Sequence, residues 1–275
     1  MKRILITGAN SYIGTSFMKW MQQWPEQYKI KIVDTIDGSW MDKDFSNYDI
    51  LFHVAGIAHQ KEKKDMKDIY YNINCKLAED IANKAKSSGI KQFIFMSSMS
   101  VYGIQTGIIN SKTELKPKTY YGWSKMFAEQ KLLQLQDQDF KIGIIRAPMI
   151  YGKGCRGNYS VLSKYAKKLT IFPNIKNSRS MLYIDNLSSF VKKIIDNGAN
   201  GIFFPQNKEY VCTSDMVYQI AQLYGKKVKL VKIFNPIIKN INIGLFNKIF
   251  GDLVYEKMDL CDEVSFVQSI MDTER

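Results

Sequence analysis

Short apolar runs alternate with amphipathic segments along the first 150 residues of this 275-residue chain. The apolar runs lie at 3–7, 29–33, 49–56, 92–96 and 141–146, and their shortness favours buried strands of a parallel sheet. Residues at helical spacing follow at 15–21, 68–86 and 121–135. This alternation predicts an α/β fold, a Rossmann-type doubly wound parallel sheet.

Two parts of the chain depart from this alternation. After Asp34, the stretch up to and including Asp49 holds only fifteen residues, too few for a helix and a strand with their turns, so we expect one abbreviated crossover. After residue 151, glycines at 152, 154 and 157 predict a loop that leaves the sheet. The chain should return to the sheet at 180–184, form a helix at 187–195 and a strand at 201–204, and then begin a helix that 213–215 cap and Gly225 ends.

These breaks predict two interleaved parts. Residues 1–154 and 179–205 are expected to form a dinucleotide-binding domain, and residues 155–178 and 206–275 a smaller substrate-binding lobe. The segment 235–250 is apolar and dotted with lysines, which fits either a membrane-surface segment or a packing surface for the core or a dimer. Packing is favoured, because a small lobe needs apolar surface and the segment has no clear basic face directed at lipid.

The first strand leads into a turn that can hold a phosphate. Gly8 ends the strand, and Gly14 lies six residues later, where a helix must press against that strand. The free amides at the start of such a helix suit a pyrophosphate. Asp34 ends the second strand twenty residues beyond Gly14, where its carboxylate could bind both ribose hydroxyls and repel a 2′-phosphate. The pattern favours NAD over NADP, although an ordinary glycine turn followed by a surface aspartate is the alternative.

Chemically active side chains follow two later elements. Ser98 stands at the carboxyl end of the 92–96 strand, the edge at which parallel sheets bind ligands. Tyr121 and Lys125 are four apart on a helix and therefore share one face. The ammonium, together with an oxidised nicotinamide, would lower the pKa of the phenol and make it a general base. A surface tyrosine–lysine pair is the alternative. His53, inside a strand, is expected to be a packed core residue.

Composition narrows the class of protein. The chain has 39 basic and 26 acidic residues, a net charge of +13, but the lysines are dispersed and carry no nucleic-acid motif, so most are expected to be solvated. Four scattered cysteines and two histidines indicate neither a zinc site nor a disulfide framework. No apolar run approaches the roughly 20 residues that cross a bilayer, and the N-terminal strand lacks a signal-peptide pattern. We expect a cytoplasmic protein without a metal or membrane insertion.

Taken together, these motifs resemble the extended short-chain dehydrogenase/reductase family, in its nucleotide-sugar epimerase, dehydratase and ketoreductase branch. The resemblance covers nearly the whole chain. Its motifs are Thr7-Gly8 through Gly14, Asp34, His53-Val-Ala-Gly56, Ser98 in Ser-Ser-Met-Ser-Val-Tyr-Gly, Tyr121-x-x-x-Lys125, Arg146-Ala-Pro-Met-Ile-Tyr-Gly152 and Arg179-Ser-Met-Leu-Tyr-Ile-Asp185.

The resemblance implies a role for each matching residue. Ser98, Tyr121 and Lys125 are the catalytic set. The cofactor would contact Gly8, Asn10, Ser11, Tyr12, Ile13, Gly14, Asp34, Val54, Ala55, Gly56, Tyr121, Lys125 and Pro148. Ser98, Asn158 and Arg179 would bind the substrate, a nucleotide-diphosphate sugar. Ser11 departs from the family, which usually has glycine there, and its side chain would crowd or hydrogen-bond the pyrophosphate. A homodimer is the usual family arrangement.

Two mechanisms use this catalytic set. In the first, a nucleotide-sugar 4-epimerase of the UDP-glucose 4-epimerase type, Tyr121 takes the hydroxyl proton, NAD takes the hydride, and the transient 4-keto sugar turns over before the hydride returns. In the second, an NAD(P)H-dependent reductase delivers hydride once to a 4-keto nucleotide sugar. The epimerase is favoured. A dehydratase would want an acidic pair where the chain has Met99-Ser100, and a non-catalytic cofactor-binding regulator would have no need for the catalytic set.

Overall fold

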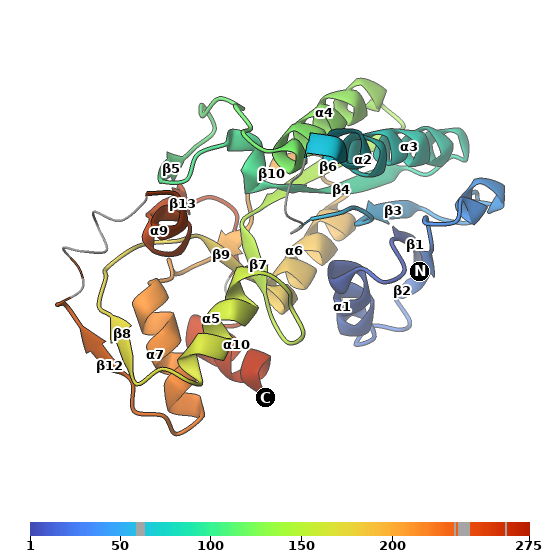
Figure 1. Ribbon diagram of the computed structural model, residues 1–275. Coiled ribbons are helices and arrows are strands. Elements are labelled where there is room, and N and C mark those ends of the chain that lie inside the picture. The colour runs from blue at the N-terminus through green and yellow to red at the C-terminus, as the bar shows by residue number, and fades with distance from the viewer. Residues whose placement is uncertain (59–63, 234, 236–242, 262) are drawn as a thin grey trace. The chain divides into compact units, whose positions relative to one another are not determined.

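A computed structural model describes residues 1–58, 64–233, 235, 243–261 and 263–275. The contacts between residues divide the chain into two compact units (Figure 1). The first unit contains residues 1–103, 114–147 and 188–204, and the second contains residues 104–113, 148–187 and 205–275. The predicted division into a dinucleotide-binding domain and a substrate-binding lobe concerns function, so it stays a prediction.

The first unit is built on a six-stranded sheet in which every neighbouring pair is parallel. The strand order is β10-β6-β4-β3-β1-β2. The strands are β1 (Lys2–Thr7), β2 (Tyr28–Val33), β3 (Ile50–His53), β4 (Gln92–Ser98), β6 (Lys141–Ala147) and β10 (Gly201–Phe203). This sheet confirms the predicted α/β fold of Rossmann type.

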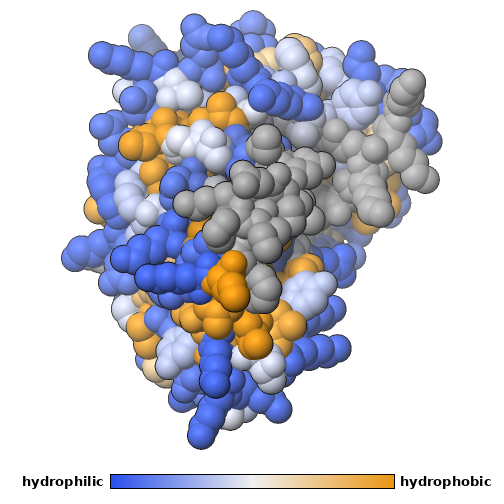
Figure 2. All heavy atoms as spheres, turned by 60° about the vertical axis from the view of Figure 1, so that its left-hand side comes forward, coloured by the Kyte–Doolittle hydropathy of each residue, from blue (hydrophilic) through white to orange (hydrophobic). Residues whose placement is uncertain are grey.

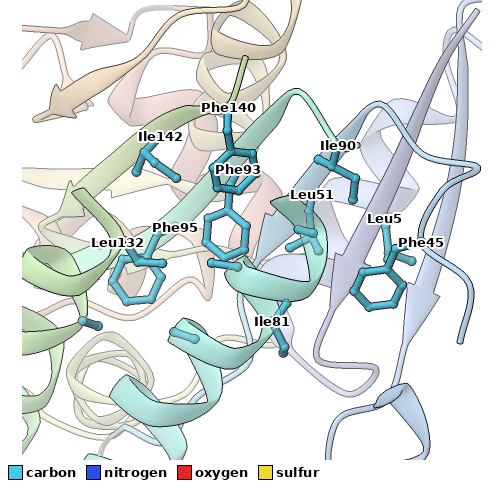
Figure 3. Close-up of a cluster of buried hydrophobic side chains, with 14 of the residues drawn as sticks. Leu5, Phe45, Leu51, Ile81, Ile90, Phe93, Phe95, Leu132, Phe140 and Ile142 are labelled. Carbon is cyan, nitrogen blue, oxygen red and sulfur yellow. The ribbon is translucent and has the colours of Figure 1, made fainter. Parts of the chain in front are cut away.

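Helices cover both faces of this sheet (Figure 1). They are α1 (Tyr12–Met21), α2 (Lys67–Tyr71), α3 (Leu77–Ser87), α4 (Tyr120–Leu135) and α6 (Ile184–Asn197). Figure 3 shows the core between the sheet and α3 and α4, where Phe93, Phe95 and Leu51 meet Ile81 and Leu132. On the opposite face Phe17 of α1 packs edge-on against Phe52, with ring centroids 5.3 Å apart. The sheet is therefore buried on both sides, as parallel sheets require.

The crossover from β2 to β3 is abbreviated, as predicted. It contains no sheet strand, only the short 3-10 helix η1 (Ser39–Asp42), and it buries Trp40 and Phe45 against the sheet. The chain therefore turns directly from β2 on one side of β1 to β3 on the other. The strand order thus reverses between β1 and β3, the position at which open α/β sheets bind ligands beyond their carboxyl ends.

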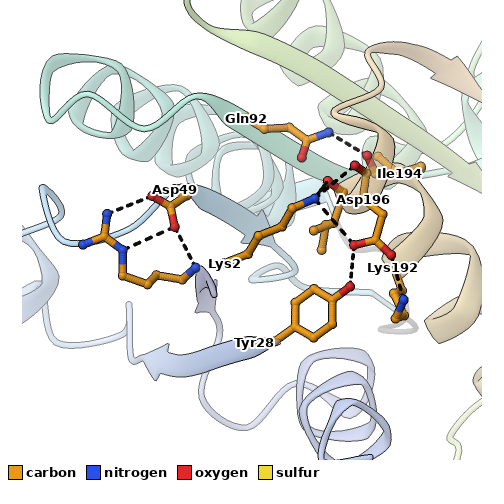
Figure 4. A network of polar contacts seen from close by, with 9 residues as sticks. Lys2, Tyr28, Asp49, Gln92, Lys192, Ile194 and Asp196 are labelled. Atoms are coloured by element: carbon orange, nitrogen blue, oxygen red, sulfur yellow. Dashed lines mark hydrogen bonds and ion pairs between the residues drawn. The ribbon is translucent and has the colours of Figure 1, made fainter. Parts of the chain in front are cut away.

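Polar contacts join the elements at the opposite end of the sheet, where Lys2, Asp49 and Gln92 line a pocket. Figure 4 shows Lys2 donating to the carbonyls of Ile195 and Asp196, at 2.7 and 3.0 Å, at the C-terminus of α6. Arg3 binds Asp49, with 2.8 Å between Nη2 and Oδ1. The Gln92 amide donates to the carbonyls of Ile194 and Ala199. The bonds from Lys2 and from Gln92 to Ile194 satisfy carbonyls in the last turn of α6, and the Lys2 ammonium lies where cations favour a helix C-terminus.

The second unit consists of short elements. Four pairs of parallel strands join β5 (Gly107–Ile109) with β13 (Leu253–Tyr255), β7 (Met149–Tyr151) with β9 (Met181–Tyr183), β8 (Ile171–Pro173) with β12 (Lys229–Val231), and β11 (Gln206–Asn207) with β14 (Leu260–Cys261). Its described helices are α5 (Asn158–Ala166), α7 (Thr213–Leu223), α9 (Ile243–Phe250) and α10 (Phe266–Glu274). Buried Tyr151 stacks on Tyr159 and shares a 2.5 Å hydrogen bond with Ser269 of α10.

Two predicted details of this region are wrong. Residues 181–183 do not return to the main sheet but pair with β7, because β10 already occupies the sheet edge beside β6. Helix α7 does begin at Thr213, but no side chain of residues 213–215 caps it; instead the Asn177 side chain accepts from the Thr213 N–H at 2.9 Å. Within the segment 235–250, residues 236–242 lie outside the described residues, so the choice between packing and a membrane surface stays open.

No helix of the described residues is both long and apolar enough to span a membrane.

Candidate active site

The turn between β1 and α1 needs glycine at both ends. Gly8 has φ +99°, and a Cβ there would lie 3.0 Å from the backbone N and Cα of Ala55. At Gly14 a Cβ would lie 2.9 Å from Val54 Cγ2 and 3.1 Å from Ile6 Cγ2. These approaches bring the turn against the carboxyl end of β3, at the point where the strand order reverses. As predicted, Gly8 permits a tight turn and Gly14 permits the close packing of the helix on the strands.

Ser11 caps the helix that starts at this turn. Its backbone is extended, and its Oγ accepts the Gly14 N–H at 3.3 Å, as an N-cap serine does. Asn10 is exposed in the turn, while Tyr12 and Ile13 open the first turn of α1. First-turn amides lack partners inside the helix, which makes them suitable for an anion. The Ser11 hydroxyl already accepts from one of these amides, a feature that a glycine would not have.

Asp34 follows β2 at the same edge of the sheet. The Gly8 N–H donates to the Val33 carbonyl at 3.0 Å, so the aspartate begins next to the glycine turn. Its Oδ1 accepts the Ile36 N–H at 3.0 Å, which fixes the orientation of a partly exposed carboxylate. The second oxygen, Oδ2, could accept bonds from a ribose.

Ser98 and Tyr121 meet at the carboxyl end of β4. Ser98 is the last residue of that strand, and its Oγ accepts the Ser100 N–H at 3.1 Å. Tyr121 lies in the first turn of α4, and its phenol is hydrogen-bonded to the Ser98 side chain. Gly122 permits this approach, because a Cβ there would lie 2.6 Å from the Ser100 carbonyl oxygen. The predicted serine and tyrosine are thus in contact.

Lys125 lies one helical turn further and is buried. Its Nζ donates to the Met96 carbonyl at 2.8 Å and lies 4.5 Å from the centroid of the Phe95 ring. Burial lowers the pKa of Lys125 to about 8, although the nearby Glu129 carboxylate opposes the shift. A Cβ on Gly56 would come within 3.5 Å of this Nζ. The lysine therefore reaches the loop after β3, the same loop that packs on the glycine turn.

The pKa of Tyr121 is raised, whereas the sequence-based expectation was that it would be lowered. Burial raises the pKa of this phenol, and the hydrogen bond from Ser98 lowers it only partly. Lys125 is not among the groups that shift the pKa. The physical reason is desolvation, which disfavours the phenolate more than the surrounding side chains favour it. The protein groups by themselves therefore keep Tyr121 protonated.

Asn74 is a site residue that sequence reasoning missed. It is buried in a π-helical turn, η3 (Asn72–Lys76), between α2 and α3. Its Oδ1 accepts the Ile57 N–H at 2.8 Å, and its Nδ2 donates to the Ile57 carbonyl at 3.1 Å and to Ser124 Oγ at 3.0 Å. Asn74 thus ties the loop after β3 to α4. A polar residue at an inward position of an amphipathic helix was the signal, and π-turns are frequent at functional sites.

A buried ion pair links α4 to the sheet. Glu129 of α4 binds Arg146 of β6, with 2.6 Å between Nη2 and Oε2, and also accepts from the Ser97 hydroxyl. The Arg146 Nη1 donates to the Tyr102 hydroxyl at 2.8 Å. The network joins α4 to β4, β6 and the turn after β4, and so orients the segments that carry Tyr121 and Ser98. An arginine within an apolar strand was the available signal.

Other predicted residues have separate surroundings. His53 is fully buried and stacks on Phe93 and Phe95, which confirms its packed role; burial lowers its pKa to about 3. Pro148, Asn158 and Arg179 belong to the second unit. Asn158 is exposed at the start of α5. The Arg179 Nη1 donates to the carbonyls of Gly251 and Asn247, at 2.8 and 3.2 Å, at the end of α9. The binding roles of these three residues stay predictions.

The family of the chain follows from comparison with known proteins. The sequence pattern of the "NAD dependent epimerase/dehydratase family" matches residues 4–212, which include the glycine turn, Ser98, Tyr121 and Lys125. The chain belongs to this family. The predicted resemblance to nucleotide-sugar epimerases is thereby confirmed, as is the prediction of an NAD-dependent enzyme of the short-chain dehydrogenase/reductase type.

Individual relatives show how broad the family is. The chain is 28% identical over 291 residues to a UDP-glucose 4-epimerase of Vibrio cholerae, covering 96% of this chain and 85% of the relative. Among solved structures it shares the fold of a UDP-glucuronic acid 4-epimerase of Bacillus cereus in complex with NAD (TM-score 0.76, 17% identity, 99% and 97% coverage). It also shares the fold of a dTDP-4-dehydrorhamnose reductase of Clostridium acetobutylicum (TM-score 0.68, 21% identity, 84% and 83% coverage).

Proposed function

We propose that the protein is a nucleotide-sugar 4-epimerase that uses NAD and acts on a UDP-glucose-like substrate through a transient 4-keto sugar. The observation that carries the proposal is the contact of Tyr121 with Ser98 at the carboxyl edge of the sheet. Lys125 lies close to Gly56, in the loop that packs on the glycine turn, so the phenol and the proposed cofactor site belong to the same edge. The similarity to a UDP-glucose 4-epimerase over nearly the whole chain supports the choice of substrate class.

The residues around the glycine turn fit NAD. Gly8 and Gly14 allow the turn to pack closely on Ala55 and Val54. The first turn of α1 then offers the amides of Tyr12 and Ile13 to a pyrophosphate. Asn10 and Ser11 would border the same group. The Asp34 carboxylate would accept ribose hydroxyls and repel a 2′-phosphate, which favours NAD over NADP. Val54, Ala55, Gly56 and Pro148 would line the remainder of the cofactor site.

Tyr121 would act as the base on the sugar 4-hydroxyl. NAD supplies reversible hydride acceptance at the sugar C4. Tyr121 removes the proton from the 4-hydroxyl, and Ser98, already hydrogen-bonded to the phenol, orients the sugar oxygen. When the flat 4-keto sugar has turned over, Tyr121 returns the proton. The same residue therefore serves as base and then as acid, and no proton is consumed over the cycle.

This role requires a lower pKa than the protein groups provide. Burial raises the pKa of Tyr121, and Lys125 directs its Nζ at the Met96 carbonyl. We infer that NAD, when bound, would supply the missing stabilisation of the phenolate through the positive charge of its oxidised ring, since a nearby opposite charge favours the ionised phenol. Proton removal is then coupled to the oxidised state of the cofactor.

The substrate diphosphate would be held by the second unit. Arg179 offers a planar set of donors suited to phosphate oxygens, of which Nη1 already donates to the carbonyls that end α9. Asn158, exposed at the start of α5, would contribute an amide. We further infer a homodimer in the cytoplasm.

A second candidate function is an NAD(P)H-dependent reductase of 4-keto nucleotide sugars. It is favoured by the shared fold with a dTDP-4-dehydrorhamnose reductase and by the abbreviated crossover after Asp34. The two candidate functions differ in whether the cofactor must leave the protein after each turnover. An epimerase regenerates its cofactor within each cycle and has no need to release it, whereas a reductase must exchange it after every turnover.

The nucleotide carried by the purified protein tests the choice. The protein is denatured, the released nucleotide is identified by mass spectrometry, and UDP-glucose is then supplied without added cofactor. Stoichiometric NAD and formation of the 4-epimer support the epimerase. An empty protein that prefers NADPH and reduces a 4-keto nucleotide sugar refutes it and also contradicts the role given to Asp34.

A further inference from the structure

One end of the second unit is rich in lysine and carries no nearby acidic sequence. We call it the lysine-rich end and define it as residues 164–171 and 223–229. It includes Lys164, Lys167, Lys168, Lys226, Lys227 and Lys229. The surrounding sequence contains no aspartate or glutamate from 140 to 184 or from 216 to 251. The positive charge of the chain is therefore not evenly spread.

Contacts hold the two segments together. The parallel pairing of β8 and β12 places Lys229 opposite Ile171, and the Lys229 N–H donates to the Thr170 carbonyl at 2.9 Å. At the other side, the Lys167 Nζ lies 4.3 Å from the centroid of the Tyr224 ring. The elements that carry these lysines, β8, β12 and the ends of α5 and α7, therefore lie next to one another in the second unit (Figure 1).

Most of this charge is uncompensated. Five of the six lysines are exposed, and among the described residues only Lys167 has a carboxylate partner, Glu274 at 2.9 Å. Glu274 also accepts from Tyr159 and Ser163, and its side chain is almost fully covered. It therefore balances Lys167 alone. Mutual repulsion among the remaining ammonium groups favours an anionic partner.

Apolar side chains lie exposed between these lysines. Tyr165 is 53% exposed, Ile171 49%, Leu223 44%, Tyr224 40% and Leu169 37%. On the face shown in Figure 2, apolar patches likewise reach the surface directly beside long hydrophilic side chains. A nucleic-acid backbone is bound by cations and needs no exposed aliphatic groups. Aromatic and aliphatic side chains interspersed with lysine instead match the headgroup region of an anionic bilayer, which takes up both.

We propose that the lysine-rich end docks the protein onto an anionic lipid surface. The lysines bind the headgroups, and Ile171, Leu169 and Tyr165 enter the boundary between headgroups and acyl chains. Docking through these side chains alone is peripheral and reversible. It is independent of the proposed catalytic chemistry, which uses the carboxyl edge of the sheet in the first unit.

Vesicle binding of the full-length protein tests the proposal. Binding is measured by co-sedimentation with vesicles of phosphatidylcholine alone and with vesicles that also contain phosphatidylglycerol. We expect binding only to the anionic vesicles, with affinity falling as salt is raised. The triple substitution K226Q/K227Q/K229Q should lower the partition coefficient about a hundredfold, from roughly fivefold per lysine. A matched control, K19Q/K43Q/K91Q, removes three exposed lysines of the first unit and should leave binding within about twofold.

A second variant separates a lipid surface from other polyanions. Ile171→Ser keeps every charge and should weaken vesicle binding severalfold while leaving the weak, salt-sensitive binding of single-stranded DNA unchanged. Circular dichroism and thermal unfolding establish that each variant folds. Equal binding to neutral and anionic vesicles, equal losses in the triple variant and its control, or tighter binding of DNA than of vesicles would each overturn the proposal.

Discussion

The pair Glu129–Arg146 offers a prediction that joins stability to catalysis. Glu129 is 1% exposed and Arg146 7%, so Glu129→Gln would leave a guanidinium inside the protein without its counter-charge. The substitution keeps the shape of the side chain and one oxygen acceptor for Arg146 and Ser97. The loss is therefore electrostatic rather than a loss of packing.

The geometry sets the expected magnitude. Arg146 makes three contacts with the carboxylate, at 2.6, 3.1 and 3.1 Å, and removing one partner of such a buried pair costs about 3–5 kcal/mol. We expect a value near the lower limit, because the amide oxygen still accepts a hydrogen bond. The free energy of unfolding is measured by urea denaturation followed by circular dichroism. The surface pair Lys76–Asp80 supplies the control, since Asp80→Asn should cost no more than about 0.5 kcal/mol.

The same substitution should move the titration of the active site. Glu129 raises the pKa of Lys125 against the effect of burial, so its neutralisation should lower the pKa of Lys125 below about 8. The basic limb of the pH–rate profile should shift to lower pH in Glu129→Gln. A variant that unfolds no more easily than Asp80→Asn would show that this pair does not stabilise the fold. A variant that keeps the wild-type pH profile would show that Glu129 does not act on Lys125.

Three further predictions concern single side chains of the site. Tyr121→Phe should lower turnover by about 10²–10⁴-fold while NAD binding, measured by calorimetry, stays within a few-fold, and an active variant would remove Tyr121 from the mechanism. Ser11→Gly should tighten NAD binding severalfold, because the first-turn amide now bound by Ser11 Oγ becomes available, and should cost only a few tenths of a kcal/mol in unfolding; unchanged or weaker binding would contradict this. The pKa of Lys125 falls from its ordinary value of 10.5 to about 8 in the folded protein, so the unfolded state binds more protons between these values and stability contributed by this group rises with pH across that window. Lys125→Met should therefore be more stable than the parent at pH 7, with the difference in unfolding free energy shrinking toward pH 10 in paired denaturation curves. A difference that stays constant with pH would show that burial does not lower the pKa of Lys125.

Local patterns were sufficient to predict the frame of the site. Gly8 and Gly14 are required by contacts with strands that the apolar runs had already located, and Tyr121 and Lys125 share a face because helical spacing puts them there. The fifteen residues from Thr35 to Asp49 were too few for another strand, whatever their sequence. In each case the decisive quantity was a distance along the chain.

Features that depend on distant partners could not be predicted in this way. Asn74 acts through Ile57 and Ser124, seventeen and fifty residues away, and Glu129 meets Arg146 only because α4 packs on β6. The prediction that 180–184 return to the main sheet was wrong for the same reason, since β10 pairs with the edge of β6 that was available. The pKa of Tyr121 depends on burial, which spacing does not reveal.

The short crossover also decides which strand is left at the rim of the sheet. Among the described residues, β2 is the last strand on this side of the sheet. One edge of β2 therefore carries main-chain groups without a neighbouring strand, the kind of edge on which other chains can add and aggregate. Lys29 and Lys31 lie exposed on β2, and charged lysines are a common means of discouraging such addition. The short crossover therefore leaves β2 as an edge strand, and its two exposed lysines oppose pairing with another chain. A chain with uncharged residues at 29 and 31 should aggregate more readily.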